Sequence, residues 1–213
     1  MKFPKIKKNW WLLFIFNIAY ILIFAFYYIY IASYEFLFYI SVVVFLSLLI
    51  VITINKTKFN NFILWLLSFA GFLHMAGGGI FIGGKNLYHL NIIHLFGSGD
   101  SFVLRFDQVA HFYGIFVITI VAYHLLNIYL IKKNNLLLRC VVVFFIGIGW
   151  GALVEIQEFA TVVMFQNTGV GGYYNNSLDL VFNALGAVTA SIILYLKNKR
   201  ETKNNANKKR KRI

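Results

Sequence analysis

The sequence is poor in charged residues, and acidic ones are the scarcest: only 7 of its 213 residues are Asp or Glu. One cysteine, Cys140, excludes an intramolecular disulfide framework. The single proline, Pro4, precedes every long apolar run. The sequence contains no GxxxxGKS/T, CxxC or HExxH motif and no internal repeat. These absences argue against a disulfide-stabilised domain, a P-loop nucleotide enzyme and the common zinc motifs.

Apolar residues, in contrast, are abundant, at 60% of the chain. They gather in six long runs, and an apolar run of about 20 residues is typical of a membrane-spanning helix. The sequence therefore predicts an all-α, polytopic membrane helix bundle of about six helices, formed by residues 1–196. The expected spans are residues 10–32, 36–54, 62–84, 107–131, 136–164 and 179–196.

The distribution of Lys and Arg predicts the orientation of these spans. With the N-terminus in the cytoplasm, 18 of the 20 basic residues fall on the cytoplasmic side, leaving only Lys85 and Arg105 outside. Such an asymmetry follows the positive-inside rule. We therefore expect a multi-pass protein of the plasma (inner) membrane with both termini in the cytoplasm.

Residues 197–213, KNKRETKNNANKKRKRI, carry nine of the basic residues and contribute most of the net charge of +13. Their composition predicts a disordered cytoplasmic tail that lies against anionic lipid headgroups. Nucleic-acid binding by this tail is the less favoured interpretation, because the other basic residues follow the membrane topology.

The polar residues within the spans form three pairs, and each pair has the spacing that places two side chains on one helix face. They are Asp107 with His111, Glu155 with Glu158, and Asp179 with Asn183. Glu155 is 19 residues into its span, which is about 28 Å of helix and close to the outer edge of a bilayer core. Asp107 and Asp179 are expected in first helical turns at the same side. The sequence thus predicts that these residues share one depth near the outer face.

Each of these residues also has a structural interpretation. Carboxylates in a first turn complement the helix dipole, His111 could bond a backbone carbonyl, and Asn183 could join two helices. The glutamates fit such interpretations least, because a charge within a span costs about 2.5–3.5 kcal/mol on insertion scales. A proton, a metal ion, or a cation such as Arg105 would offset that cost, and His74 is a further candidate partner. His89 and His94 lie in the connection between the third and fourth expected spans and are expected to be solvated.

Small residues indicate where the helices approach one another. Gly147 and Gly151 are four residues apart, and Gly186 and Ala190 repeat the spacing, a pattern typical of close helix contacts. These faces predict that the fifth and sixth spans pack together and bring the glutamates near Asp179. The run MAGGGIFIGG favours a broken or re-entrant end to the third span.

The strings LHMAGGG, RFDQVAHFYG, VEIQEF and SLDLVFNALGA resemble the YjdF-like family of prokaryotic inner-membrane proteins, from about His74 to Ala187. The pattern is more loosely similar to VanZ-like membrane proteins, which are tied to glycopeptide resistance. NNSL stands where the VanZ-like pattern has an arginine-rich approach to its last motif. The resemblance implies a six-helix bundle and marks the residues to test, but it supplies no reaction.

Three functions are compatible with these patterns. In the first, Asp107, His111, Glu155, Glu158 and Asp179 are catalytic residues or ligands of a divalent metal ion, with His74, Arg105 and Asn183 binding substrate. Such a site would hydrolyse or transfer a group on a lipid-linked substrate. The alternatives are an ion-coupled transporter, and a structural or partner-binding membrane protein in which the polar residues only lock the bundle.

Overall fold

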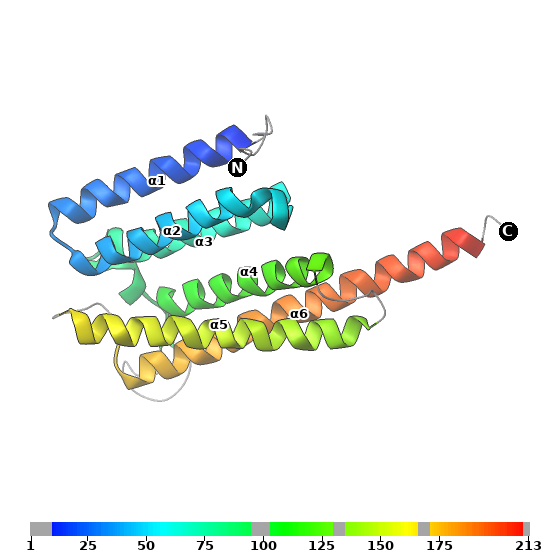
Figure 1. Cartoon of the computed structure of the whole chain (residues 1–213). Coiled ribbons are helices and arrows are strands. Elements are labelled where there is room, and N and C mark those ends of the chain that lie inside the picture. The colour runs from blue at the N-terminus through cyan, green and yellow to red at the C-terminus, as the bar shows by residue number, and fades with distance from the viewer. Residues whose placement is uncertain (1–9, 95–102, 130–134, 166–170, 211–213) are drawn as a thin grey trace.

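The computed structural model describes residues 10–94, 103–129, 135–165 and 171–210, and six long helices dominate it (Figure 1). All six are long and apolar enough to cross a membrane, which confirms the predicted all-α membrane bundle. The helices are α1 (Trp11–Tyr30), α2 (Tyr34–Thr57), α3 (Asn61–Gly79), α4 (Phe106–Tyr129), α5 (Leu136–Met164) and α6 (Tyr173–Arg210).

Asparagine caps fix the starts of two of these helices. The Asn60 side chain accepts a hydrogen bond from Ile63 N, and the Asn135 side chain accepts one from Leu138 N, each at 2.9 Å. Such caps satisfy N–H groups that a helix leaves free at its first turn. They set the registers of α3 and α5, on which His74 and the two glutamates lie.

The helices alternate in direction, so the start of α1 and the end of α6 point to the same end of the bundle (Figure 1). The closest packing is among α4, α5 and α6, and α3 joins this group through α4. Helices α1 and α2 pack on α3. Aromatic side chains fill the α1–α2–α3 core, where the Tyr28 hydroxyl donates a 2.5 Å hydrogen bond to Met75 O.

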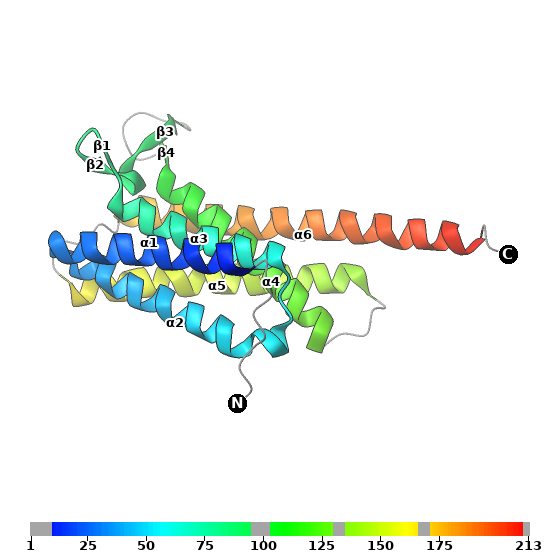
Figure 2. The same cartoon turned by 90° about the horizontal axis from the view of Figure 1, so that it is seen from above.

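Short strands gather at one end of the bundle, which we call the strand end (Figure 2). Strands β1 (Phe81–Ile82) and β2 (Lys85–Asn86) form a hairpin, and β3 (Asn91–His94) pairs antiparallel with β4 (Val103–Arg105). The 3₁₀ helix η2 (Leu87–His89) lies between the two strand pairs in the chain. These elements lead from α3 into α4.

The expected third span, 62–84, is wrong at its end. The helix stops at Gly79, and Gly83 and Gly84 adopt positive φ angles of 59° and 81° in the turn of the β1–β2 hairpin. Two successive positive φ angles are what a tight two-residue hairpin turn requires.

The glycines before that point are not a helix break, since α3 continues through all three. The aromatic rings of Tyr88, Phe36 and Phe24 pack against the bare backbone of Gly77, Gly78 and Gly79 respectively. The glycine run therefore permits close ring packing rather than a re-entrant turn.

Helix α6 is longer than expected at both ends. It begins at Tyr173, so Asp179 lies in its second turn rather than at a cap. It continues to Arg210 and projects beyond the other helices (Figures 1 and 2), so the expectation of a disordered tail is wrong for residues 197–210. No Gly or Pro follows Gly186 in the sequence, and the lysine, arginine and alanine there favour helix. Residues 1–9, Lys132, Lys133 and 211–213, on which part of the charge asymmetry rests, lie outside the described residues.

Candidate functional site

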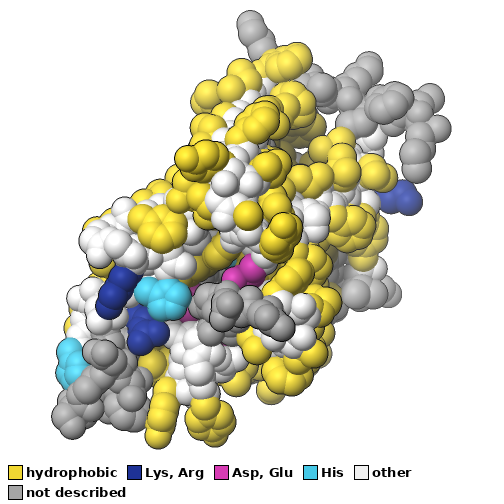
Figure 3. Space-filling model, turned by 90° about the vertical axis from the view of Figure 1, so that its left-hand side faces the viewer, with side chains coloured by type: hydrophobic (Ala, Val, Ile, Leu, Met, Phe, Trp, Pro, Cys, Tyr) yellow, Lys and Arg dark blue, Asp and Glu magenta, His cyan; other side chains and the backbone are white. Residues whose placement is uncertain are grey.

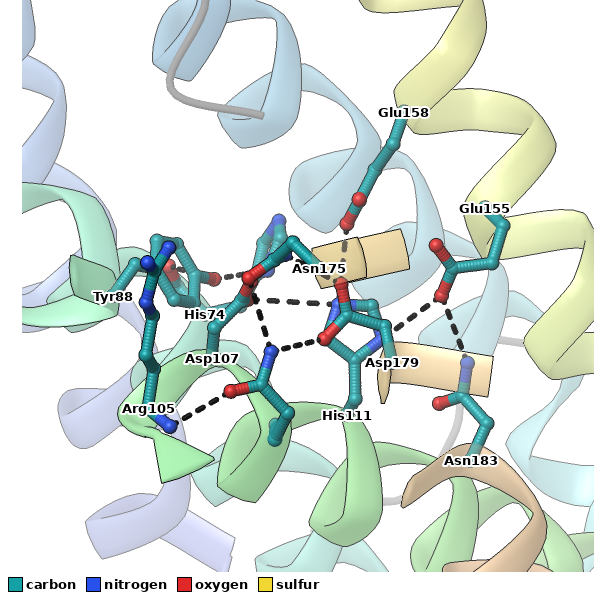
Figure 4. Close-up of polar contacts among 11 residues, drawn as sticks. His74, Tyr88, Arg105, Asp107, His111, Glu155, Glu158, Asn175, Asp179 and Asn183 are labelled. Carbon is teal, nitrogen blue, oxygen red and sulfur yellow. Dashed lines mark hydrogen bonds and ion pairs between the residues drawn. The ribbon is translucent and has the colours of Figure 1, made fainter. Parts of the chain in front are cut away.

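Five ionisable side chains from three helices converge near the strand end (Figure 4). We call them the acidic cluster: Asp107 and His111 from α4, Glu155 and Glu158 from α5, and Asp179 from α6. The cluster contains four of the seven acidic residues of the chain. The structure thus brings together all five residues singled out as catalytic or metal-ligating, while those roles stay a prediction.

His111 is at the centre of this cluster. Its Nε2 lies 3.5 Å from Asp107 Oδ1 and 3.3 Å from Glu158 Oε1, and its Nδ1 lies 3.4 Å from Glu155 Oε1. Its side chain is only 7% exposed. Both ring nitrogens therefore face carboxylates, so His111 is not the backbone-bonded interfacial histidine of the structural interpretation.

Two amide side chains hold the aspartates together. Asn175 Nδ2 donates to Asp107 Oδ2 at 2.9 Å and to Asp179 Oδ2 at 2.7 Å. Gln108 Nε2 donates to Asp179 Oδ1 at 2.6 Å, and Gln108 Oε1 accepts from Arg105 N at 2.8 Å. Gln108 and Asp179 are fully buried. This network fixes the carboxylates of α4 and α6 relative to each other and to the start of α4.

Glu155 and Asn183 form the other side of the cluster. Asn183 Nδ2 donates to Glu155 Oε1 at 2.9 Å. Glu155 Oε2 and Asn183 Oδ1 are buried and have no hydrogen-bond partner among the described residues. Buried polar atoms are nearly always satisfied, so these two unsatisfied acceptors point to groups that supply positive charge or protons.

The cluster contains two sets of potential metal ligands. In each set, one ligand atom per residue lies within 4.8 Å of the others. The sets are Asp107, His111 and Asp179, and Glu155, Glu158 and Asp179. Carboxylate oxygens with one imidazole suit hard or borderline divalent ions.

Glycine packing explains how α5 and α6 come close enough to form this site. A Cβ atom on Gly151 would lie 2.9 Å from Asn183 Cβ, and one on Gly147 would lie 2.9 Å from Ala187 Cβ. The predicted contact face of Gly147 and Gly151 is therefore confirmed. Gly186 differs from expectation, because it packs on the backbone oxygen of Phe112 in α4 rather than on α5.

Of the three residues expected to bind substrate, only Asn183 contacts the acidic cluster directly. His74 Nδ1 lies 2.6 Å from the Tyr88 hydroxyl, which also donates to His74 O at 2.9 Å. Burial, and then the charges of Asp107 and Glu158, raise the pKa of Tyr88 well above its ordinary value, so its hydroxyl stays protonated. The Arg105 side chain instead lines a neighbouring cavity.

Sequence reasoning missed two residues of the site, Gln108 and Asn175. The signal for Asn175 is its spacing: it precedes Asp179 by four residues, and Asn183 follows by four more. This stripe becomes visible only when α6 is known to begin at Tyr173. Gln108 directly follows Asp107, and only the position of α6 shows that its side chain reaches Asp179.

Comparison with known proteins places the chain among membrane proteins. The family described as "Predicted membrane protein (DUF2238)" matches residues 12–200, in agreement with the resemblance to YjdF-like proteins. An uncharacterized protein of Thermotoga maritima is 35% identical over 101 residues, a stretch that covers 45% of this chain and 50% of the relative. The match thus spans about half the length of that relative. No solved structure matches.

Proposed function

This chain belongs to the DUF2238 family of membrane proteins, and we propose that it binds a divalent metal ion in the acidic cluster. The metal would serve the hydrolysis or transfer of a group on a lipid-linked substrate. The observation that carries the proposal is the buried His111 ring among three carboxylates, together with the unsatisfied Glu155 Oε2 and Asn183 Oδ1.

The charge of the cluster supports a cation there. Four carboxylates lie together, and among the described residues His111 is the only basic group in contact with them. Buried like charges repel strongly unless they are paired, protonated or bound to metal. A divalent ion would satisfy several carboxylate oxygens at once. Once bound, such an ion polarises a substrate oxygen or lowers the pKa of a water molecule.

The residues around the ion would divide the remaining work. Gln108 and Asn175 hold Asp107 and Asp179 in place through their amide hydrogen bonds, which is the role of outer-shell partners in metal sites. Glu158, whose carboxylate contacts His111 Nε2, would take up a proton as a general base.

A large apolar cavity supports the lipid-linked part of the proposal. It has a volume of about 430 Å³ and lies among α1, α2, α3, α4 and α5. Gly114 and Ile115 in its wall follow His111 by one turn of α4, and Val154 directly precedes Glu155. A hydrocarbon chain in this cavity would place an attached headgroup at the acidic cluster.

The orientation of the protein is part of the proposal. Lys85 and Arg105, the two basic residues expected outside, lie on the elements of the strand end. By the positive-inside rule, the acidic cluster would then face the outside of the plasma membrane and both termini the cytoplasm.

Ion-coupled transport has weaker support. Toward the opposite end of the bundle, described polar side chains bond locally rather than in a chain. Asn17 Nδ2 donates to Ser68 Oγ at 2.7 Å, and His124 Nε2 lies 2.9 Å from Thr57 O. Arg139 bonds Asn127. A proton or ion path needs polar groups that connect across the membrane.

The test is the metal content of protein purified in an uncharged detergent and incubated with Zn²⁺, Mn²⁺ or Mg²⁺. Wild type should retain stoichiometric metal, and His111→Ala and Asp179→Asn should lose it. Glu201→Gln is the matched control, because it removes a carboxylate from the far part of α6. Metal-free wild type, or unchanged metal in the cluster variants, would show that the cluster is only structural or proton-binding.

A further inference from the structure

The two basic residues expected outside the membrane meet at one cavity of the strand end. Between Lys58 and Lys132 the chain contains only two Lys or Arg residues, Lys85 and Arg105. Although they are 20 residues apart, both line a cavity of about 230 Å³ together with Asn86, His89 and Asn91. We call these five residues the basic pocket; none of them is acidic.

The short strands and η2 position the members of this pocket. Strand β2 carries Lys85 and Asn86, and Asn91 of β3 pairs in register with Arg105 of β4. The Asn86 side chain caps η2 by accepting from His89 N at 3.3 Å, and it also bonds His89 Nδ1. Asn86 and His89, which this bond joins, both line the cavity.

The charges of the pocket form no ion pair with the part of the chain that the structure describes. No carboxylate of a described residue pairs with the Lys85 ammonium or the Arg105 guanidinium. The pocket therefore has Lys85, Arg105, two asparagines and the His89 imidazole around one space. A volume of about 230 Å³ exceeds several times the roughly 30 Å³ share of one water molecule, so a tetrahedral oxyanion fits.

The basic pocket lies next to the acidic cluster. Arg105 precedes Asp107 by two residues, and its backbone N–H bonds Gln108, which bonds Asp179. The charge of Asp107 also acts on His89. Figure 3 shows the strand end, where Lys or Arg and His side chains lie beside a hollow with acidic side chains in it.

We propose that the basic pocket binds a phosphate group of the substrate, next to the reaction centre formed by the acidic cluster. The proposal rests on the proposed function and deepens it, because it assigns the lipid-linked substrate to the phosphate-bearing amphiphiles. Arg and Lys are the side chains that bind phosphate best. The acidic cluster cannot bind such an anion without a metal ion, so the two sites divide the work: the pocket holds the anion and the cluster holds the metal.

The experiment measures anion binding to metal-free protein, in EDTA, so that it does not depend on the metal site. Inorganic phosphate is titrated by calorimetry into protein in an uncharged detergent. In a second arm, the protein is placed in nanodiscs of phosphatidylcholine with or without phosphatidic acid, and the binding of phosphatidic acid to the protein is measured. Lys85→Ala and Arg105→Ala should each weaken binding about tenfold, since each removes one charge-assisted contact. The double variant Lys197→Ala with Arg200→Ala, which removes two exposed charges from α6, should bind as wild type.

The two arms identify the source of the phosphate. Tighter binding to phosphatidic acid than to inorganic phosphate supports a lipid headgroup, and equal binding supports the same pocket with a free phosphate. Two outcomes overturn the proposal. In one, Lys85→Ala and Arg105→Ala bind the anion as tightly as wild type. In the other, wild type neither binds inorganic phosphate nor prefers phosphatidic acid to phosphatidylcholine. Arg105→Lys should retain most of the binding, which guards against a variant that merely misfolds.

Metal content, measured on each preparation after incubation with Zn²⁺, Mn²⁺ or Mg²⁺ and before EDTA is added, separates this proposal from the proposed function. The pocket variants should retain the metal of wild type. Loss of anion binding with normal metal content supports both sites as independent. If wild type contains metal but binds no anion, the basic pocket is rejected and the metal site stands. If wild type binds the anion but contains no metal, the metal site is rejected and the basic pocket stands.

Discussion

Asn183 Nδ2 donates a 2.9 Å hydrogen bond to Glu155 Oε1, and Glu155 Oε2 and Asn183 Oδ1 are buried without a partner among the described residues. One residue comes from α6 and the other from α5, so the bond joins the two helices at the acidic cluster. The pair is therefore half satisfied, which is costly in a buried position. A cation bound to Glu155 Oε2 would satisfy that oxygen.

Asn183→Ala should lower the free energy of unfolding by about 1–3 kcal/mol in metal-free protein, because Glu155 Oε1 loses the hydrogen bond that Asn183 Nδ2 donates. A divalent metal ion should restore part of this loss, since a ligand stabilises the folded state by about 2.7 kcal/mol at a hundredfold excess over Kd. Thermal unfolding in detergent, with EDTA or with added Zn²⁺ or Mn²⁺, measures both effects. Equal melting temperatures with and without metal in wild type would contradict the metal interpretation.

Gly151→Ala should separate α5 from α6. The new Cβ would lie 2.9 Å from Asn183 Cβ, and such overpacking costs about 1–3 kcal/mol. We expect a lower melting temperature and weaker metal retention. Gly149→Ala is the matched control, because its Cβ meets nothing within 4 Å. If the two variants behave alike, close packing at Gly151 is not what holds the cluster together.

Anion binding at the basic pocket should depend on pH through His89. The pKa of His89 lies below 6.5, mainly because the side chain is partly buried. The charges of Arg105 on β4 and, more weakly, Lys85 on β2 also lower this pKa, whereas the charge of Asp107 on α4 raises it. A bound anion favours the imidazolium and raises this pKa, so binding takes up a proton. Affinity should therefore rise as the pH falls and level off below the pKa of His89 in the free protein, which lies below 6.5.

Sulfate is the probe for this measurement, because it keeps its charge over the range where phosphate itself titrates. Calorimetry between pH 5 and about pH 8 should show the increase in wild type. In His89→Gln the affinity should no longer change with pH. A pH dependence that survives in His89→Gln would assign the titration to another group.

The proposed orientation can be tested with single cysteines, because the only native one, Cys140, is buried and replaceable. In a Cys140→Ala background, Asn91→Cys on β3 should react with a membrane-impermeant maleimide in intact bacterial cells. Lys203→Cys on α6 should react only after the cells are opened. Both positions are exposed in the structure, so the reverse labelling would mean that the positive-inside rule misassigns this protein.

Much of this architecture was accessible from the sequence because apolar run length is a strong signal. Span 136–164 coincides with α5, and the remaining spans overlap their helices. The errors lie at the hairpin turn of Gly83 and Gly84 and at the two ends of α6. At these boundaries the length of an apolar run carries no information, because local backbone geometry and helix propensity decide where the helix ends.

The sequence by itself determined that the chain forms membrane helices, that its basic residues are unevenly distributed, and which rare polar side chains share a helix face. Only the tertiary structure decided how these faces meet: that Gln108 and Asn175 join Asp107 to Asp179, that His74 pairs with Tyr88, and that Lys85 meets Arg105. The physical reason is that lipid is as apolar as the bundle interior, so the apolar pattern does not show which face of a helix is buried. Helix rotation is set instead by close contacts such as Gly151 against Asn183, and these exist only once the helices are packed.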